Sequence, residues 1–311
     1  MLQRVKGRLA KGGRTTFEIG AEGEFNVGKL LLNLCPQRSV TIPLCYFHAK
    51  MFCRIALSRA RSFTTRSFAT TRPSASSPIV ELREYKLKPE HSATYIKHTT
   101  DYADVRHSHV PTRLFSLPET GGQLHVATHF YHYAGYEQRD QARAQMPADE
   151  QWMTYLQLVR PCVQEQISTV FTEAPLVQEF NLHGMANGSS PGDDSAKTSY
   201  EIRRYQLQLG YDTVPKFLEH YQKGLPSKMN APGTCPSTSL VTLLYNDTGP
   251  LNEVIEIWRH GNGTHAMGIS REAARGATEW RNSIANIADL AISFRSTIHK
   301  PVTKNGLSKW M

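Results

Sequence analysis

Two short segments of the chain carry an acidic, a basic and a phenolic side chain at alternate positions. Residues 81–85 read ELREY, and residues 201–205 read EIRRY. Both segments alternate like β-strands, so the glutamate, arginine and tyrosine of each segment face the same side of a sheet. Such an arginine could hold an anionic ligand through two N–H donors while the tyrosines wall a pocket. The alternative is a structural ladder of ion pairs between strands, and the sequence leaves both interpretations open.

These segments open two copies of one longer pattern, at residues 79–180 and 199–300. Trp280 follows Trp152 by 128 residues, and other matches between the copies have nearly the same offset, which indicates an internal repeat. Residues 181–198 are rich in Gly, Ser and Asp and are expected to be a linker. Hydrophobic spacing predicts strand, helix, strand, strand, helix, strand in each copy, the order of a ferredoxin-like unit. The predicted strands are 79–88, 112–117, 123–133, 165–180, 199–209, 238–245, 252–260 and 291–299, and the predicted helices are 89–106, 136–161 with a break near Pro147, 211–223 and 270–289.

Alternation along the strands also predicts which side chains the helices cover. Leu82, Phe130 and Ile257 belong to an apolar set that we expect beneath the helices. The opposite face carries large aromatic and charged side chains, which would be exposed if each sheet stood alone. We therefore expect the two sheets to close face to face into one α+β barrel with these residues inside. The candidate ligand-binding residues of the barrel interior are Glu81, Arg83, Tyr85, His129, Tyr131, Tyr133, Glu201, Arg203, Tyr205, Glu256, Trp258 and His260.

The opening strand of each copy resembles that of the NIPSNAP family, whose domains begin with a strand of the form Y-E-[LI]-R-x-Y-x-L. The resemblance covers both copies and implies the fold of the dimeric α+β barrel superfamily. The chain departs from the family pattern in three places. Tyr131 stands where Trp is usual, His260 stands where Tyr is usual, and the tail at residues 301–311 lacks the Ser-Pro-Leu-like ending of many members.

The resemblance implies a mitochondrial protein with an interaction or ligand-binding role. In animals the family is linked to vesicle transport and to recruitment of the autophagy machinery on damaged mitochondria, and no catalysis is established for it. Mitochondrial or autophagy-related proteins are thus the partners that the resemblance implies. Related α+β barrels include cofactor-independent monooxygenases and haem-degrading enzymes that use the barrel interior as a reaction chamber. A small-molecule enzyme of this kind is therefore the alternative, by analogy of fold alone.

Positive charge is concentrated at the beginning of the chain. The net charge is +9, yet residues 1–78 contain 13 basic and 3 acidic side chains, and the remaining residues contain 23 and 24. The near-neutral remainder argues against a nucleic-acid partner. Residues 51–77 contain five arginines, no acid and many Ser and Thr, the composition of a mitochondrial transit peptide. We therefore expect Met51 to be the native start, residues 1–50 to be a non-native or disordered extension, and the protein to lie in the matrix or peripheral to a mitochondrial membrane.

Other kinds of site are not predicted. Residues 23–29 have the G-x4-G-K spacing of a phosphate-binding loop, but Leu30 replaces the Ser or Thr that would hold Mg²⁺. No histidine spacing is typical of a metal site, and no cofactor is expected, although haem stays open as an alternative. The five cysteines have no regular spacing, and no apolar stretch is long enough to span a membrane. The sequence leaves open whether the two copies close on each other, as a pseudo-dimer, or on a second chain as a homo-oligomer.

Overall fold

The computed structural model of the chain describes residues 6–8, 14–16, 77–187 and 196–308. Apart from its last residue, the predicted transit peptide lies outside the described residues, as does the loop-like motif at residues 23–29. Within the predicted extension, β1 (Lys6–Arg8) and β2 (Arg14–Thr16) pair antiparallel. Residues 1–67 and 68–311 are separate compact units, and the second unit is described below.

Eight strands of the second unit form one closed antiparallel barrel in the order β10-β4-β5-β3-β6-β8-β9-β7. Each half of the unit supplies four neighbouring strands, and the two halves join where β6 meets β8 and where β10 meets β4. The protein is thus a mixed α+β fold, and both copies of the repeat close on each other within one chain. The strands are β3 (Ile79–Leu87), β4 (Thr112–Thr120), β5 (Val126–Tyr133), β6 (Val163–Glu173), β7 (Ser199–Leu207), β8 (Thr238–Thr248), β9 (Glu253–His260) and β10 (Ala291–Pro301).

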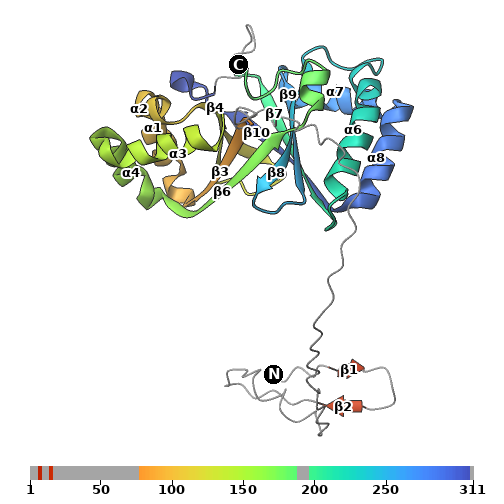
Figure 1. Ribbon diagram of the computed structural model, residues 1–311, viewed down its shortest axis with the longest axis horizontal. Coiled ribbons are helices and arrows are strands. Elements are labelled where there is room, and N and C mark those ends of the chain that lie inside the picture. Colours follow the sequence, from red (N-terminus) through yellow and green to blue (C-terminus); the bar gives the residue numbers. More distant parts are fainter. Residues whose placement is uncertain (1–5, 9–13, 17–76, 188–195, 309–311) are drawn as a thin grey trace, which may run out of the picture. The chain divides into compact units, whose positions relative to one another are not determined.

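The helices cover the outside of the barrel, those of the first half on one side and those of the second half on the other (Figure 1). The predicted helix at 89–106 is divided at Tyr102, and the break near Pro147 is present. The last predicted helix begins earlier than expected, at Gly263, and is interrupted at Gly276, a residue that favours helix termination. The helices are α1 (Ser92–Asp101), α2 (Ala103–His109), α3 (Tyr136–Gln145), α4 (Glu150–Val159), α5 (Leu176–Glu179), α6 (Thr213–Met229), α7 (Gly263–Arg275) and α8 (Thr278–Leu290), with 3-10 turns at Pro89–His91, Met146–Ala148, Arg160–Cys162 and Lys304–Gly306.

No helix among the described residues is long and apolar enough to cross a membrane. The longest, α6, has 17 residues, and its buried side chains lie on one face against the sheet, as expected of an amphipathic helix in a globular domain.

The interior of the barrel is packed with aliphatic and aromatic side chains from both halves. Leu82, Phe130, Ile202, Ile255 and Ile257 are at most 1% exposed and belong to one cluster there. The prediction that this set faces the helices is therefore wrong. The twelve candidate residues instead lie on the outer face of the strands, beneath the helices. This correction applies to Glu81, Arg83, Tyr85, His129, Tyr131, Tyr133, Glu201, Arg203, Tyr205, Glu256, Trp258 and His260.

The two environments explain this arrangement physically. A closed barrel shields its inner face completely from water, so an unpaired charge there would carry a large desolvation cost. On the outer face, the covering helices supply arginines and a tyrosine that donate hydrogen bonds to the glutamates of the strands. The polar face is therefore satisfied by helices rather than by the other sheet.

Candidate functional site

The second half holds a cavity of about 520 Å³ between its helices and its strands. Residues of α6, α7 and α8 form one side of this second-half cavity, and residues of β7, β8 and β9 form the other. Both its volume and its largely apolar lining are typical of small-molecule sites. The apolar walls include Met229, Leu240, Trp258, Met267, Trp280 and Ile284.

Lys228, in the last turn of α6, places its amine at this cavity. The Nζ atom lies 3.7 Å from the ring centre of Trp258 and 4.3 Å from that of Trp280, distances at which a cation interacts with an indole. The residue is only 9% exposed, and its Nζ makes no hydrogen bond to any described residue. Burial lowers the pKa of Lys228 to about 7, although the negative charge of Glu256 acts in the opposite direction. A buried amine without a hydrogen-bond partner thus lies against two indole rings at the edge of the cavity.

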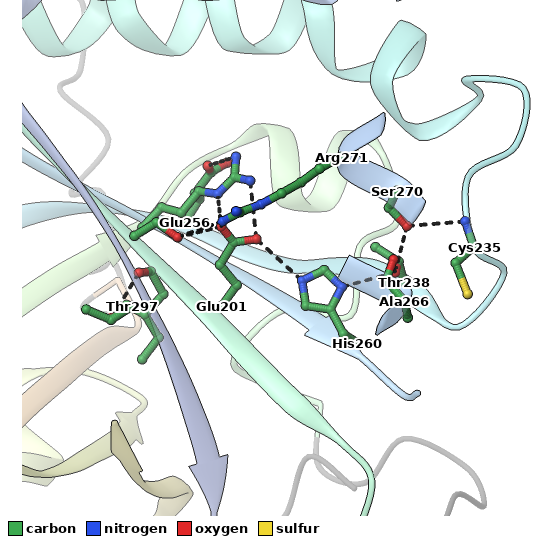
Figure 2. Close-up of polar contacts among 12 residues, drawn as sticks. Glu201, Cys235, Thr238, Glu256, His260, Ala266, Ser270, Arg271 and Thr297 are labelled. Atoms are coloured by element: carbon green, nitrogen blue, oxygen red, sulfur yellow. Dashed lines mark hydrogen bonds and ion pairs between the residues drawn. The ribbon is translucent and has the colours of Figure 1, made fainter. Parts of the chain in front are cut away.

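Glu201, on β7, accepts most of the hydrogen bonds at the polar end of the cavity (Figure 2). Its Oε1 accepts from Arg203 Nε at 2.5 Å, from Arg271 Nη2 at 2.5 Å and from Ser296 Oγ at 2.6 Å. Its Oε2 lies 3.4 Å from His260 Nε2. Burial alone would raise the pKa of Glu201, but hydrogen bonds from His260 and Arg203 and the charge of Arg203 hold it well below its usual range. Glu201 is therefore ionised at neutral pH.

His260 connects this carboxylate to a chain of hydroxyl groups (Figure 2). Its Nδ1 lies 3.0 Å from Thr238 Oγ1, which accepts from Ser270 Oγ at 2.9 Å. Burial lowers the pKa of His260, so the contact with Glu201 is a hydrogen bond from a neutral ring. Because the carboxylate can only accept, Nε2 carries the proton and Nδ1 accepts from Thr238. Both ring nitrogens are therefore engaged within the protein.

Glu256 is a second buried carboxylate, on β9 next to Arg203. It accepts from Arg203 Nη1 and Tyr205 Oη, each at 3.0 Å, and from the hydroxyl of Tyr221. Burial would raise the pKa of Glu256, but the charges of Lys228 and Arg203 hold it below its usual value. The negative charges of the two glutamates thus offset the positive charges that converge on this face.

The first half contains a corresponding ion-pair cluster. Glu81 Oε1 accepts from Arg83 Nε at 3.0 Å, from Arg143 Nη2 at 2.6 Å and from Ser168 Oγ at 2.6 Å. Burial opposes ionisation, but Arg83, Arg143 and Ser168 together lower the pKa of Glu81 to about 2. The glutamate, arginine and serine occupy the same places as Glu201 and its partners in the second half. The structural ion-pair interpretation of the two opening segments therefore describes both halves.

The two halves differ in the cation that a helix places at the cavity. The first-half cavity, of about 480 Å³, is bordered by the guanidinium of Arg106, from α2. Arg106 donates to Tyr155 Oη at 2.7 Å and to Tyr131 Oη at 2.8 Å, and lies 3.2 Å from His129 Nδ1. Burial lowers the pKa of His129 well below its usual value, so this ring is a neutral acceptor. Arg106 has these partners in place, whereas Lys228 has none.

Seven of the twelve sequence candidates border one of these two cavities, which lie on opposite sides of the barrel, and five border neither, namely Glu81, His129, Tyr133, Tyr205 and Glu256. Glu201, Arg203, Trp258 and His260 border the second-half cavity, while Arg83, Tyr85 and Tyr131 border that of the first half. Among the described residues there is no group of three or more His, Cys, Asp or Glu side chains that could hold a metal ion.

Sequence reasoning missed four side chains of these sites because they come from helices, namely Arg106, Arg143, Lys228 and Arg271. Arg143 and Arg271 are 128 residues apart, as are Trp152 and Trp280, so a complete alignment of the two copies could have found them. Arg106 and Lys228 precede the second strand of their halves and differ in type. No signal in the sequence distinguishes these two from ordinary surface cations.

Comparison with solved structures supports the fold. A candidate monooxygenase from Fusobacterium nucleatum is 10% identical, covers 73% of this chain and 94% of its own chain, and has a TM-score of 0.52. A similar protein from Lactobacillus acidophilus is 11% identical over 72% of this chain and 94% of its own, with a TM-score of 0.47. At such identities the likeness to the first protein shows the fold alone, namely an α+β barrel. No curated protein matches the chain.

Family comparison gives a match within the first half. The NIPSNAP family model matches residues 80–178. A NIPSNAP family protein of unknown function from Agrobacterium tumefaciens is 21% identical over 32% of this chain and 94% of its own, with a TM-score of 0.30. The match includes β3 to β6 with the helices between them, and with them the Glu81 ion-pair cluster. Residues 80–178 of this chain are a NIPSNAP domain.

Proposed function

We propose that the protein binds a small, mainly apolar ligand in the second-half cavity. The observation that carries this proposal is the amine of Lys228, which is buried at the cavity without a hydrogen-bond acceptor. Buried polar groups nearly always have a partner. A ligand that presents a carbonyl or carboxylate oxygen to Nζ would supply it, and its apolar body would lie against the apolar walls of the cavity.

A groove beside the cavity favours an elongated ligand. This groove, of about 370 Å³, shares Trp280, Ile284 and Ala288 with the cavity. It continues toward β10, where Ile292 is 65% exposed and Phe294 is 54% exposed. Exposed apolar side chains next to a cavity are typical of a binding surface. The ligand's polar group would thus lie near Lys228, and its far end would reach this groove.

The fluorescence of Trp258 and Trp280 provides a direct test of binding. Titration with 1-naphthoic acid and with 2-naphthalenemethanol is expected to quench this fluorescence and to raise the melting temperature. The variant Ala274→Phe places a ring in the cavity wall and is expected to abolish both effects. The control, Gly268→Phe, adds the same ring to the same helix where a new Cβ meets nothing within 4 Å. No effect of either probe on the parent protein, or equal responses from the two variants, would refute the proposal.

An enzyme of the α+β barrel type has less support. The barrel interior, the expected reaction chamber, is packed with side chains, so any reaction would take place in the cavities between helices and strands. His260 could hold a haem iron only through a free ring nitrogen, and both of its ring nitrogens are engaged. We therefore propose binding without catalysis as the function that the geometry favours.

The mitochondrial assignment is also a proposal. It is supported by the excess of basic residues in residues 1–78 and by the acid-free composition of 51–77. Partners in vesicle transport or autophagy would follow from the NIPSNAP resemblance. Mass spectrometry of the native protein tests the proposed import into mitochondria, because removal of a transit peptide would leave a mature N-terminus close to residues 66–78. A mature chain that retains residues 51–65 would contradict removal of a transit peptide.

We further propose that both halves descend from one ferredoxin-like unit. Support comes from the strand order, which is β4-β5-β3-β6 in the first half and β8-β9-β7-β10 in the second. It also comes from register, since Glu81 lies opposite Tyr131 and Glu201 lies opposite Trp258. A separately expressed half that dimerises into an eight-stranded barrel would support this origin, whereas a half that folds only as a monomer would speak against it.

A further inference from the structure

We propose that Lys228 is a nucleophilic amine that takes up a carbonyl ligand, an aldehyde or ketone with an apolar body, as a Schiff base. This inference rests on the proposed function, because it assigns a ligand class to the same cavity. It goes further in that the bond would be covalent and reversible.

The first support is the position of the nitrogen. Lys228 lines a cavity of about 520 Å³, and a carbonyl carbon can reach its buried Nζ once the amine turns from the two indole rings toward that space. No described residue accepts a hydrogen bond from Nζ, so its lone pair is available whenever the amine is neutral. The rings of Trp258 and Trp280, at 3.7 Å and 4.3 Å, limit the directions in which the amine can point. Aromatic rings beside the nitrogen would also stack on a flat aldehyde.

The charges around Lys228 come from every element packed against it. Glu256 on β9 and Glu201 on β7 favour the ammonium, while Arg203 on β7 and Arg271 on α7 disfavour it. Arg281 of α8 also lines the cavity. Burial outweighs the two carboxylates and lowers the pKa of Lys228 to about 7. A desolvated lysine of this kind has the properties of amines that attack carbonyl groups in proteins.

The chemistry requires no group beyond the amine, the carbonyl compound and water. The lone pair of Nζ attacks the carbonyl carbon, and the oxygen takes up a proton to give a carbinolamine. The C–O bond then breaks, the C=N bond forms, and the oxygen leaves as water with both protons of the former amine. No electrons are gained or lost.

A trapping experiment with the full chain tests this inference. The protein is incubated with 2-naphthaldehyde and sodium cyanoborohydride at pH 7, digested, and analysed by mass spectrometry for the reduced adduct on each lysine. Lys223 is an exposed lysine of the same helix and serves as the internal reference. About half of an amine with a pKa of about 7 is neutral at that pH, against roughly one in three thousand for an ordinary lysine. Allowing for the lower reactivity of a weaker base, we expect about 100-fold more adduct on Lys228.

Two variants and a pH series make the result decisive. Lys228→Met is expected to lose the adduct, whereas Lys223→Arg is expected to match the parent both in labelling of Lys228 and in binding of 2-naphthalenemethanol, which has the same apolar body and no carbonyl. Should Lys228→Met not fold, the labelling rate of the parent protein gives the answer. The labelling rate of Lys228 is expected to reach half of its maximum near pH 7, and a rate that still rises steeply above pH 9, as for an ordinary lysine, would overturn the inference.

The outcomes separate this inference from the proposed function. If the alcohol binds and is displaced by the aldehyde, but Lys228 is labelled no more than Lys223, the Schiff base is refuted and binding in the cavity is not. If neither compound binds and Lys228 is not labelled, both are refuted. Preferential labelling of Lys228 that Ala274→Phe abolishes would support both.

Discussion

Replacement of Lys228 by methionine is expected to stabilise the protein, although it removes a charged side chain. The folded state lowers the pKa of this amine from 10.5 to about 7. At neutral pH the unfolded chain therefore keeps the amine protonated, whereas folding removes about half of that protonation, and this difference lowers the stability of the folded state. At pH 7 this linkage costs about 4 kcal/mol. At pH 9 the unfolded lysine is still protonated but the folded one is not, and the cost falls to about 2 kcal/mol. Methionine, of similar length and apolar, has no such cost.

The sign follows from the direction of the shift. Between pH 7 and 10.5 the unfolded state binds more protons than the folded state, so this lysine makes stability rise with pH. The advantage of Lys228→Met over the parent should therefore shrink by about 2 kcal/mol between pH 7 and pH 9. Subtracting the free energy of unfolding of one protein from that of the other removes the contribution of every other titrating group that they share.

Urea unfolding of both proteins at pH 7, 8 and 9 measures this difference. Lys223→Met, at an exposed position of the same helix, is the matched control and should differ from the parent by less than about 0.5 kcal/mol at each pH. A difference between parent and Lys228→Met that does not change with pH would show that the amine titrates normally. In that case the reasoning from burial is wrong, and the Schiff-base inference loses its electrostatic support.

Three further predictions concern the groups around the cavities. Glu201→Gln leaves Arg203 and Arg271 beside a neutral amide and is expected to cost about 3 kcal/mol in urea unfolding. Glu81 has its pKa lowered to about 2, so its stabilising contribution is complete above about pH 4.5 and is lost as the pH falls toward 2; calorimetry from pH 5 to 3 should show a smaller drop in melting temperature for Glu81→Gln than for the parent. Trp280→Ala is expected to cost about 3–5 kcal/mol and to weaken quenching by 2-naphthalenemethanol, and unchanged affinity would place the probe elsewhere.

The strands could be predicted from the sequence because two independent signals agreed. Alternation along residues 79–88 recurs along 199–209, and the structure has strands at Ile79–Leu87 and Ser199–Leu207. The helix boundaries are predicted less accurately than the strands. For example, α7 begins seven residues before the predicted start at residue 270. Its first turns contain small and polar residues, and their helical state depends on packing against β9 and β7 rather than on local preference.

The direction of each strand face could not be predicted, because alternation gives two sets of residues but not their environments. Leu82 and Glu81 are neighbours in sequence, yet the side chain of Leu82 lies inside the barrel and that of Glu81 lies on its outer face beneath α3. An aliphatic face suits a helix or a second sheet equally well. The deciding information lies in the helices, where Arg143 and Arg271 provide partners for the glutamates. Paired charges can be buried on a helix-covered face, and only a spatial arrangement reveals the pairing.

The contrast between Arg106 and Lys228 is the reason that we place the proposed ligand in the second half. Each comes from a helix that precedes the second strand of its half, and each lies against the third strand. Arg106 donates from its two Nη atoms to Tyr155 and Tyr131, which links α2 to α4 and β5 in the first half. Lys228 lies against indole faces that cannot accept a conventional hydrogen bond. The two halves thus differ at corresponding places, with a hydrogen-bonded guanidinium in the first half and a buried amine without a hydrogen-bond partner in the second.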